Sequence, residues 1–402
     1  MEQPVVISEI AQDIATKSVS VLGSTGSVGC NTLDLMARQP DRFQAVALSG
    51  NRNVELLAEQ ARIFKPTIAV VAAEEHYKDL KQALSGTGVK AAAGRDALIH
   101  AAEMEADLVI AGIVGIAGLE STLAAAKRGA TVALANKECL VCAGDLLLRE
   151  IEKSGGTLLP VDSEHNAIFQ VFDFDQVESV RKLILTASGG PFLNTSIDKM
   201  ASVIPEEAVA HPNWDMGAKI SVDSATMMNK GLELIEAYHL FPVAPEQIDI
   251  LVHPQSVIHS MVEYVDGSVL AQLGTPDMRT PIAYALAWPN RMATPAPSLD
   301  LDQIATLTFE TPDVKRFPSI QLACEALKSG GAAPIVLNAA NEIAVHHFLN
   351  HDIPFLAIPQ VVDETLCRHC FAAPENIHDV TLIDLETRKI TEKLVKSIAY
   401  AK

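Results

Sequence analysis

Residues 18–29 read SVSVLGSTGSVG, and this stretch decides the fold of the first part of the chain. SVSVLG has the pattern of a buried strand, and a helical pattern follows from Ser27 to Arg38. The glycines between them permit a tight turn and let the backbone approach a pyrophosphate at the helix N-terminus. Alone, a glycine trio also fits a bare turn. Its place between a strand and a helix favours a dinucleotide site.

Strand-like and helical patterns continue to alternate downstream of this turn. The runs FQAVALSG, TIAVVAA, DLVIAGIVG and ATVALAN read as strands, with helical patterns between them. Such alternation is typical of a parallel sheet covered on both faces. We therefore expect an N-terminal Rossmann-type parallel-sheet domain over residues 1–161.

The rest of the chain changes character. Residues 162–287 mix strand-like runs with a helical stretch near Asp223–Tyr238, which predicts a central α+β domain. Residues 288–317 include the Pro-rich segment WPNRMATPAPSLDLD and read as a linker. Residues 318–402 have the apolar spacing of a C-terminal helical domain. The expected fold class is α/β, in three parts.

Composition excludes several classes of protein. The 402 residues carry 31 basic and 50 acidic side chains, a net charge of -19, which argues against nucleic-acid or anionic-membrane partners. The longest apolar stretch, Leu108–Leu119, is shorter than the ~18 residues of a membrane span. Because Glu2, Glu9 and Asp13 do not suit a signal or transit peptide, we expect a cytoplasmic protein.

The six cysteines are too few for a disulfide scaffold. Two CxxC pairs, Cys139 with Cys142 and Cys367 with Cys370, lie too far apart in the sequence for an ordinary linked zinc site. We interpret them as ordinary thiols.

The second strand ends in Gly50, Asn51, Arg52 and Asn53. An NAD site usually places an acidic residue there, whereas an arginine and two amides suit a ribose that carries a phosphate. This favours NADP(H), the alternative being a solvated loop.

Three acidic residues are candidate metal ligands. Asp162 and Glu164 would project to one face if the chain is extended there. A helix capped by Asp223 or Ser224 would carry the third, Glu233, three residues after Lys230 and four after Asn229. Solvated acids and an exposed salt-bridged helix are the alternatives, but the apolar neighbours of Glu233 imply burial, and buried charges need partners.

Two further segments fit an anionic ligand. Ser188 and two glycines end the strand KLILTA and can present a hydroxyl and backbone amides to a phosphate, although a bare turn fits as well. The motif HPNWDMG places His211, Trp214 and Gly217 in a loop that resembles an active-site lid.

These motifs resemble a known family. GSTGSVG, LANKE, PVDSEHNAIFQ, TASGGPF, HPNWDMGAKISVDSATMMNKGLELIEA and HPQSVIHSMVEYVDGSVLAQLGTPDM are similar to segments of the 1-deoxy-D-xylulose 5-phosphate reductoisomerases. The likeness runs from about Val19 to the C-terminal helices. It implies NADPH-dependent and Mg²⁺- or Mn²⁺-dependent conversion of 1-deoxy-D-xylulose 5-phosphate to 2-C-methyl-D-erythritol 4-phosphate in the non-mevalonate isoprenoid pathway.

The resemblance also implies roles for individual residues. The cofactor contacts would be Thr25, Gly26, Ser27, Val28, Asn51, Arg52, Asn53, Asn136, Glu138 and Gly217. Asn51 and Arg52 depart from the Gly-Lys-Asn that family members often have. One divalent ion would sit on Asp162, Glu164 and Glu233. The substrate would contact Lys137, Ser163, Glu164, Ser188, His211, Ser224, Asn229, Lys230 and Glu233, with its phosphate at Ser188, Ser224, Asn229 and Lys230.

By the same resemblance, the catalytic residues are Lys137, Glu164, Glu233, His211 and the covering Trp214. A carbon–carbon bond breaks and re-forms in a retro-aldol and aldol sequence, and NADPH reduces the resulting aldehyde. Lys137 would act electrostatically or in proton handling, and no residue is assigned as a general base. The likeness further implies a homodimer, with its interface on the 162–287 domain.

Rival functions each depend on a different motif. A short-chain dehydrogenase would use Tyr77 and Lys81, which we interpret as a solvated helix face. A semialdehyde dehydrogenase would use Cys139 or Cys142 as a nucleophile. A catalytically inactive NADPH sensor would not need three carboxylates. The residues Glu342, His346 and His347 lack the order of a zinc-protease motif and favour a packed helix.

Overall fold

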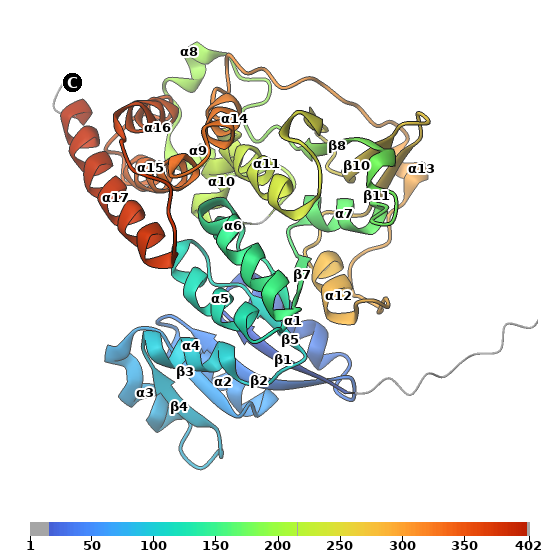
Figure 1. Ribbon diagram of the computed structural model, residues 1–402, viewed down its shortest axis with the longest axis vertical. Helices are drawn as coiled ribbons and strands as arrows, with labels where there is room; N and C mark the ends of the chain where they lie inside the picture. The colour runs from blue at the N-terminus through green and yellow to red at the C-terminus, as the bar shows by residue number, and fades with distance from the viewer. Residues whose placement is uncertain (1–15, 215, 400–402) are drawn as a thin grey trace, which may run out of the picture.

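The computed structural model describes residues 16–214 and 216–399 (Figure 1). The acidic residues Glu2, Glu9 and Asp13, which were used to predict the compartment, lie outside this part of the chain. Across the described ranges, no helix combines the length and the apolar character needed to cross a membrane.

A seven-stranded parallel sheet forms the N-terminal part, drawn from blue to green in Figure 1. Its strand order is β4-β3-β2-β1-β5-β6-β7. Both neighbours of β1 are parallel to it, with Val19 opposite Ala45 on β2 and Leu108 on β5. Burial on both faces explains why these strands read as continuous apolar runs. The strands are β1 (Lys17–Leu22), β2 (Phe43–Gly50), β3 (Ile68–Val71), β4 (Lys90–Ala93), β5 (Leu108–Ala111), β6 (Thr131–Leu134) and β7 (Thr157–Pro160).

Helices cover this sheet on both sides, as the alternation predicted. One core joins Val19 and Val21 to Leu35 of α1 and Leu57 of α2, and the other joins Val109 to residues of α5 and α6. The Rossmann-type arrangement is therefore confirmed. The helices are α1 (Ser27–Ala37), α2 (Val54–Phe64), α3 (Tyr77–Ala83), α4 (Arg95–Glu103), α5 (Leu119–Lys127) and α6 (Lys137–Ser154).

A second, mixed sheet is formed by the middle part of the chain. Its order is β11-β10-β8-β9; β10 runs antiparallel to β8 and β11, and β8 runs parallel to β9. A shared core packs Ile168 of α7 and Leu234 of α11 against Leu183 and Val262 of this sheet. The elements here are α7 (Ser163–Val171), β8 (Val180–Ala187), α8 (Ile197–Met200), α9 (Pro205–Ala208), α10 (Ala218–Ala225), α11 (Met228–Leu240), β9 (Ile248–Val252), β10 (Ile258–Tyr264), β11 (Val269–Leu273) and α12 (Arg279–Ala287).

The helical stretch near Asp223 differs from the prediction. It is two helices, α10 and α11, separated by Met227 in the left-handed conformation at φ 62°. Asp223 and Ser224 lie inside α10 and not at a cap, so the capping prediction was wrong. The Asp223 carboxylate is buried and bonds to Lys219 and Asn341, which leaves it unavailable for capping.

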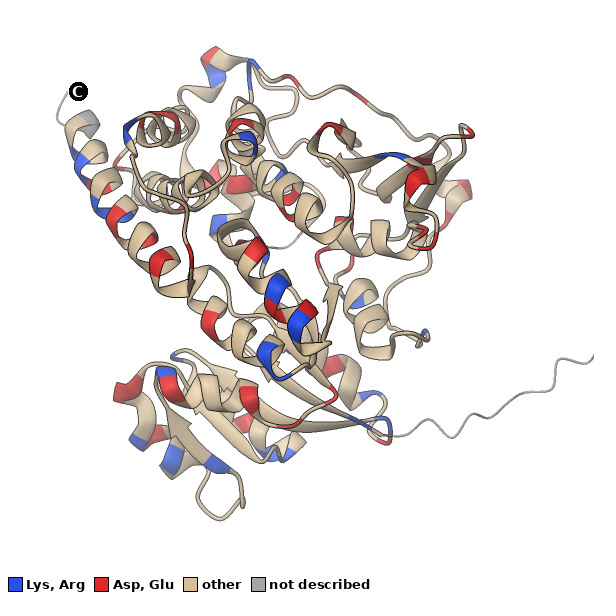
Figure 2. Cartoon of the chain, viewed as in Figure 1, with Lys and Arg blue, Asp and Glu red and all other residues tan. Residues whose placement is uncertain are grey.

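Helices dominate the C-terminal region, drawn in orange and red in Figure 1. They are α14 (Ser319–Ser329), α15 (Ala333–Leu349), α16 (Ala357–Arg368) and α17 (Ile377–Ala399), and acidic and basic residues mark the length of α17 (Figure 2). Between α12 and α14, the described elements are the short α13 (Leu301–Ile304) and one β-bridge, Val252 with Glu310. The three-part fold class is confirmed.

The exact domain boundaries stay predictions, because packing crosses them. Ile282 and Leu286 of α12 pack in the core of the first sheet, and Leu322 and Val336 of the C-terminal helices share a core with α6. Elements from all three parts therefore meet around α6.

Candidate active site

The carboxyl ends of the parallel strands face a cavity of about 850 Å³. Strand order reverses between β1 and β5, and ligands bind at such a switch point, outside the carboxyl ends of the strands. Gly26 after β1, Lys137 after β6 and Asp162 after β7 all line the cavity. The second sheet contributes Ser188, and α11 contributes Lys230.

The glycine turn has the geometry of a phosphate-binding turn. Gly23 has φ +86°, and a Cβ on it would lie 2.7 Å from the carbonyl oxygen of Gly112 at the end of β5. A Cβ on Gly29 would lie 2.3 Å from the carbonyl oxygen of Gly23, so the helix can approach the turn only without a side chain there. Gly26 is the N-cap of α1 and has no side-chain cap, which leaves the first backbone N–H groups of α1 for an anion.

The predicted NADP-selecting residues follow β2 but do not line the cavity. Asn53 caps α2, its Oδ1 accepting from the backbone N–H of Leu56 at 3.1 Å. Asn51 and Arg52 are exposed. Thr25 also lies outside the cavity lining and packs beside Gly50. Their proposed contacts with the cofactor therefore stay predictions.

The Asn136 side chain forms hydrogen bonds with the protein backbone and does not line the cavity. Its Nδ2 donates to the carbonyl oxygens of Ile113 and Gly115, at 2.5 Å and 2.8 Å, and so holds the loop after β5. The neighbouring Glu138 and the lid-loop Gly217 do line the cavity. Lys219 reaches Glu138 at 3.3 Å and Asp223 at 2.8 Å, and although burial lowers the pKa of Lys219, these carboxylates raise it above its ordinary value.

The three candidate metal ligands converge from two helices. Asp162 is the N-cap of α7 and Glu164 lies in its first turn, so this segment is helical and the extended geometry that we expected is wrong. Glu233 reaches them from α11, and one oxygen of each carboxylate lies within 4.8 Å of the others. Oxygen ligands about 2.1 Å from one Mg²⁺ lie up to about 4.2 Å apart, so small side-chain movements would let one ion bind all three.

Two buried lysines neutralise part of this acidic charge. Lys137 forms ion pairs with Asp162 and with Glu233, at 3.0 Å for the latter, and Lys230 forms ion pairs with Glu164, at 2.8 Å, and with Glu233. Burial lowers the pKa of both lysines, but the carboxylates outweigh this effect and raise it. Three carboxylates still outnumber two ammonium groups, an excess that suits a bound cation.

The carboxylates differ in their environments. Burial would raise the pKa of Glu164, but Lys230 and Ser163 lower it, and the Ser163 hydroxyl donates to Glu164 Oε2 at 2.6 Å. Burial and the neighbouring Glu164 raise the pKa of Glu233. The predicted helical face is confirmed in its contacts, since Asn229 and Lys230 both bond to Glu233.

The same cavity also has the donors of a phosphate site. Ser188 follows β8 directly, and its Oγ accepts from the backbone N–H of Gly190 at 3.1 Å. His211 Nε2 lies 2.9 Å from the same Oγ. Ser224, Asn229 and Lys230 line this cavity as well.

The His211 ring also orders the predicted lid. Its Nδ1 lies 3.1 Å from the backbone N of Asn213 and 3.0 Å from that of Trp214. Because those N–H groups donate, Nδ1 carries no proton and Nε2 donates to Ser188. Burial lowers the pKa of His211, which favours this neutral form. Trp214 lines the cavity beside His259, with ring centroids 6.1 Å apart.

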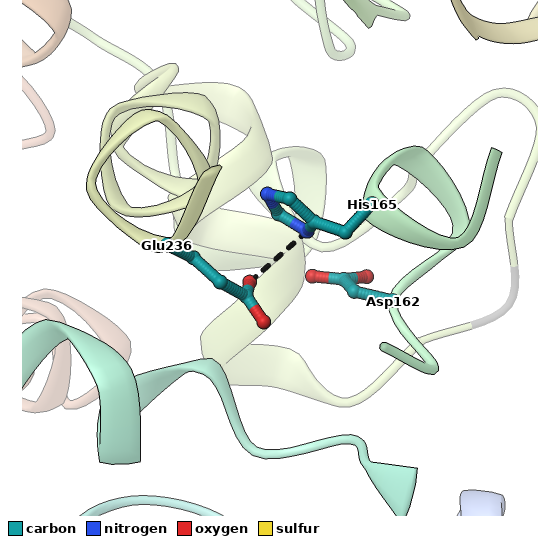
Figure 3. Close-up of side chains that lie close together, drawn as sticks. All are labelled: Asp162, His165 and Glu236. Carbon is teal, nitrogen blue, oxygen red and sulfur yellow. Dashed lines mark ion pairs between the residues drawn. The ribbon is translucent and has the colours of Figure 1, made fainter. Parts of the chain in front are cut away.

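A second polar group lies directly behind the carboxylates. His165 and Glu236 are fully buried beside Asp162 (Figure 3). Burial lowers the pKa of His165 to about 4 and raises the pKa of Glu236 well above its ordinary value. The sequence analysis missed both, although they stand in the motifs PVDSEHNAIFQ and GLELIE. The three-residue spacing of Glu233 and Glu236 could have indicated a shared helix face.

The C-terminal helices complete the cavity wall, which the sequence analysis also missed. Glu342 and His346 of α15 and Arg388 of α17 line it. Glu342 pairs with Arg388 at 2.5 Å, and within the described residues it belongs to no candidate metal cluster. The interpretation of α15 as a packed helix is thus confirmed.

The alternative nucleophile is excluded by burial. Cys139 and Cys142 lie inside α6, and burial raises the pKa of the Cys139 thiol to about 12. A thiol with that pKa is almost entirely protonated at neutral pH and is not an activated nucleophile. Tyr77 and Lys81 lie in α3, outside the cavity lining, which disfavours a short-chain dehydrogenase.

Three family models match the chain. Residues 19–144 match 1-deoxy-D-xylulose 5-phosphate reductoisomerase, residues 158–241 match the C-terminal domain of that enzyme, and residues 273–390 match the DXP reductoisomerase C-terminal domain.

Individual relatives agree over almost the whole length. The 1-deoxy-D-xylulose 5-phosphate reductoisomerase of Rhodospirillum centenum is 61% identical over 379 residues, covering 94% of each chain. That of Zymomonas mobilis is 58% identical over 382 residues, covering 95% of this chain and 98% of its own.

Solved structures show the same fold. The Zymomonas mobilis enzyme in complex with NADPH has a TM-score of 0.91 at 56% identity, covering 95% of this chain and 100% of its own. A DOX-P reductoisomerase in complex with NADPH, fosmidomycin and magnesium has a TM-score of 0.91 at 44% identity, covering 95% and 99%. The chain therefore belongs to the 1-deoxy-D-xylulose 5-phosphate reductoisomerase family.

Proposed function

We propose that this chain converts 1-deoxy-D-xylulose 5-phosphate to 2-C-methyl-D-erythritol 4-phosphate, using NADPH and a divalent metal ion. The observation that carries the proposal is the convergence of Asp162, Glu164 and Glu233 in the cavity that the glycine turn also lines. A dinucleotide bound at the turn would supply the hydride for a reduction. A cation beside it would stabilise the negative charge that develops on the substrate oxygens. The NADPH and magnesium held by the related structures support it.

The cofactor would bind along the β1–β5 switch point. Its pyrophosphate would face the N-terminus of α1 at Gly26, Ser27 and Val28, and its 2′-phosphate would lie near Arg52. Glu138 and Gly217 line the cavity further along. NADPH would supply the hydride for the reductive step.

The substrate would bind in the same cavity, against the metal-ligand carboxylates. Ser188, Ser224, Asn229 and Lys230 would bind its phosphate, and His211 would keep the Ser188 hydroxyl oriented. Ser163 would contact the substrate between the two ligands Asp162 and Glu164. The covering Trp214 would exclude water from the reacting carbons.

Asp162, Glu164 and Glu233 would hold one Mg²⁺ or Mn²⁺, which would polarise the carbonyl and neighbouring hydroxyl oxygens as a Lewis acid. Lys137 lies against two of these carboxylates and would stabilise negative charge on the same oxygens. We propose that a carbon–carbon bond then breaks and re-forms by retro-aldol and aldol steps before the aldehyde is reduced. The product would enter the non-mevalonate isoprenoid pathway, and a cytoplasmic location stays a prediction.

We also propose a homodimer. Strand β11 is an edge of the second sheet, and it exposes Val269, Leu270 and Leu273. An apolar edge strand pairs readily with a second copy. Light scattering measures the molar mass of the wild-type protein and of Leu270→Lys in solution. We expect a dimer for the wild-type protein and a shift toward monomer for Leu270→Lys.

The decisive experiment follows NADPH consumption with 1-deoxy-D-xylulose 5-phosphate, with Mn²⁺ or Mg²⁺ and after chelation. We expect substrate-dependent oxidation of NADPH that disappears when the metal is removed and returns when it is restored. NADPH oxidation that is independent of metal, or absent with this substrate, would contradict the proposal.

A further inference from the structure

The His165 and Glu236 side chains join the two helices that carry the three candidate metal ligands. His165 follows Glu164 in α7, and Glu236 lies three residues after Glu233 in α11. Figure 3 shows the His165 and Glu236 side chains facing each other from two helices. Their relative exposures are 0% and 1%, so water cannot satisfy either side chain. Polar groups at such depth need partners inside the protein.

The ring of His165 has one defined bond. Its Nε2 lies 2.9 Å from the backbone carbonyl oxygen of Glu233. A carbonyl oxygen only accepts, so Nε2 carries the proton and donates it. The ring therefore binds the backbone of a metal-ligand residue directly.

The other ring nitrogen faces Glu236. His165 Nδ1 lies 3.1 Å from Glu236 Oε2, an ion-pair contact, and within the described part of the chain neither Nδ1 nor either Glu236 oxygen has a partner in hydrogen-bond geometry. At this distance a small rotation of either side chain would let one proton between Nδ1 and Oε2 satisfy both groups. The pair is neutral overall whichever of the two atoms holds that proton, which suits a buried site.

The contacts of His165 link helix α7 to helix α11. The chain of contacts runs from Glu236 through the imidazole to the Glu233 backbone, and α7 carries the imidazole beside Asp162 and Glu164. Fixing this ring fixes the distance between α7 and α11, and hence the spacing of the three carboxylates.

We propose that Glu236, acting through His165, is a positioning residue for the divalent-cation site, an inference that rests on the proposed function. Partners that orient metal ligands typically contribute 10- to 100-fold in metal affinity. One competing arrangement is a second cation between Asp162, His165 and Glu236, whose ligand atoms also lie within 4.8 Å of one another. Both arrangements keep the bond from Nε2 to the Glu233 carbonyl oxygen, so the number of Mn²⁺ ions bound per chain distinguishes them.

The test is Mn²⁺ binding measured by calorimetry and by the spectrum of free Mn²⁺, without substrate. Glu236→Met keeps the side-chain length and removes the polar contact, and we expect it to weaken Mn²⁺ about 10- to 100-fold. Glu236→Gln can still donate to Nδ1 through its amide and should bind Mn²⁺ within about threefold of wild type. His165→Phe, which keeps a ring without nitrogens, should match Glu236→Met.

The controls distinguish loss of positioning from loss of folding and from loss of the metal site. Exposed Glu152→Met removes one surface charge and should leave Mn²⁺ affinity unchanged, and NADPH affinity and thermal unfolding show that each variant is folded. Folded Glu236→Met and His165→Phe variants that bind Mn²⁺ like wild type would overturn the positioning role alone. A second Mn²⁺ per chain that Glu236→Gln removes would overturn it in favour of a second cation site. Wild-type protein that binds no Mn²⁺ would overturn the metal site itself.

Discussion

Asn341 Nδ2 in α15 donates a hydrogen bond to Asp223 Oδ1 in α10 at 2.7 Å, across 118 residues of sequence. Both side chains are buried, and Asp223 also pairs with Lys219. The bond ties the C-terminal helices to the helix that carries Ser224, one of the proposed phosphate contacts. The C-terminal helices therefore help to position the active-site helix α10.

Replacing Asn341 by Leu should lower the free energy of unfolding by about 1–3 kcal/mol, because a buried carboxylate loses one of its two partners. Urea denaturation measures this, with exposed Asn194→Leu as the matched control. We also expect the KM for the phosphorylated substrate to rise more than kcat falls, since Ser224 would shift. An Asn341→Leu protein as stable as the control would contradict the role assigned to this bond.

Glu233→Gln should abolish turnover and weaken Mn²⁺ binding while NADPH still binds. Glu233 is the candidate ligand that bonds to both Lys137 and Lys230, so its loss removes a ligand charge and leaves both ammonium groups with fewer partners. Steady-state assays, Mn²⁺ titration and NADPH fluorescence separate the three effects. Metal-dependent turnover at the wild-type rate would remove Glu233 from the ligand set.

Arg52→Asp should weaken NADPH relative to NADH, because it replaces the cation near the proposed 2′-phosphate with an anion. The measurement is the ratio of kcat/KM for the two cofactors. Arg52→Lys keeps the charge and should keep the preference for NADPH. An unchanged ratio in Arg52→Asp would show that this exposed side chain points to solvent in the complex.

Much of this arrangement could be predicted from sequence, and the exceptions share a cause. The glycine turn and the strand–helix alternation are local patterns, so Gly26 and the parallel sheet were predictable. The geometry at Asp162 was not, because the same spacing fits a strand or a helix cap. Asp223 was misread as a cap because its partner, Asn341, is remote in sequence. The spacing of Glu233 and Glu236 hinted at a shared helix face, but the contact of Glu236 with His165 became visible only in the fold.

Replacing both Cys139 and Cys142 by Ala should leave turnover close to wild type. Both thiols are buried, and burial raises the pKa of each above its ordinary value, so neither is a nucleophile at neutral pH. A stability loss of about 1–3 kcal/mol is expected from the reduced packing in α6. The NADPH assay and thermal unfolding distinguish these outcomes, and loss of turnover in a folded variant would restore the thiol mechanism.

Acidic pH should release the loop around Trp214. His211 Nδ1 accepts from the backbone N–H groups of Asn213 and Trp214 only when it is unprotonated, and burial holds the pKa of His211 below its ordinary value. When the loop opens, this pKa returns to about 6.5, so the ordered loop is fully favoured above that pH and loses stability as pH falls below it. Trp214 fluorescence, recorded without substrate in a Trp288→Phe background, should therefore change as pH falls below 6.5. His211→Asn keeps an oxygen acceptor for the two N–H groups but does not titrate, so its fluorescence should stay constant across the same range; an identical pH profile in both proteins would assign the transition to another group.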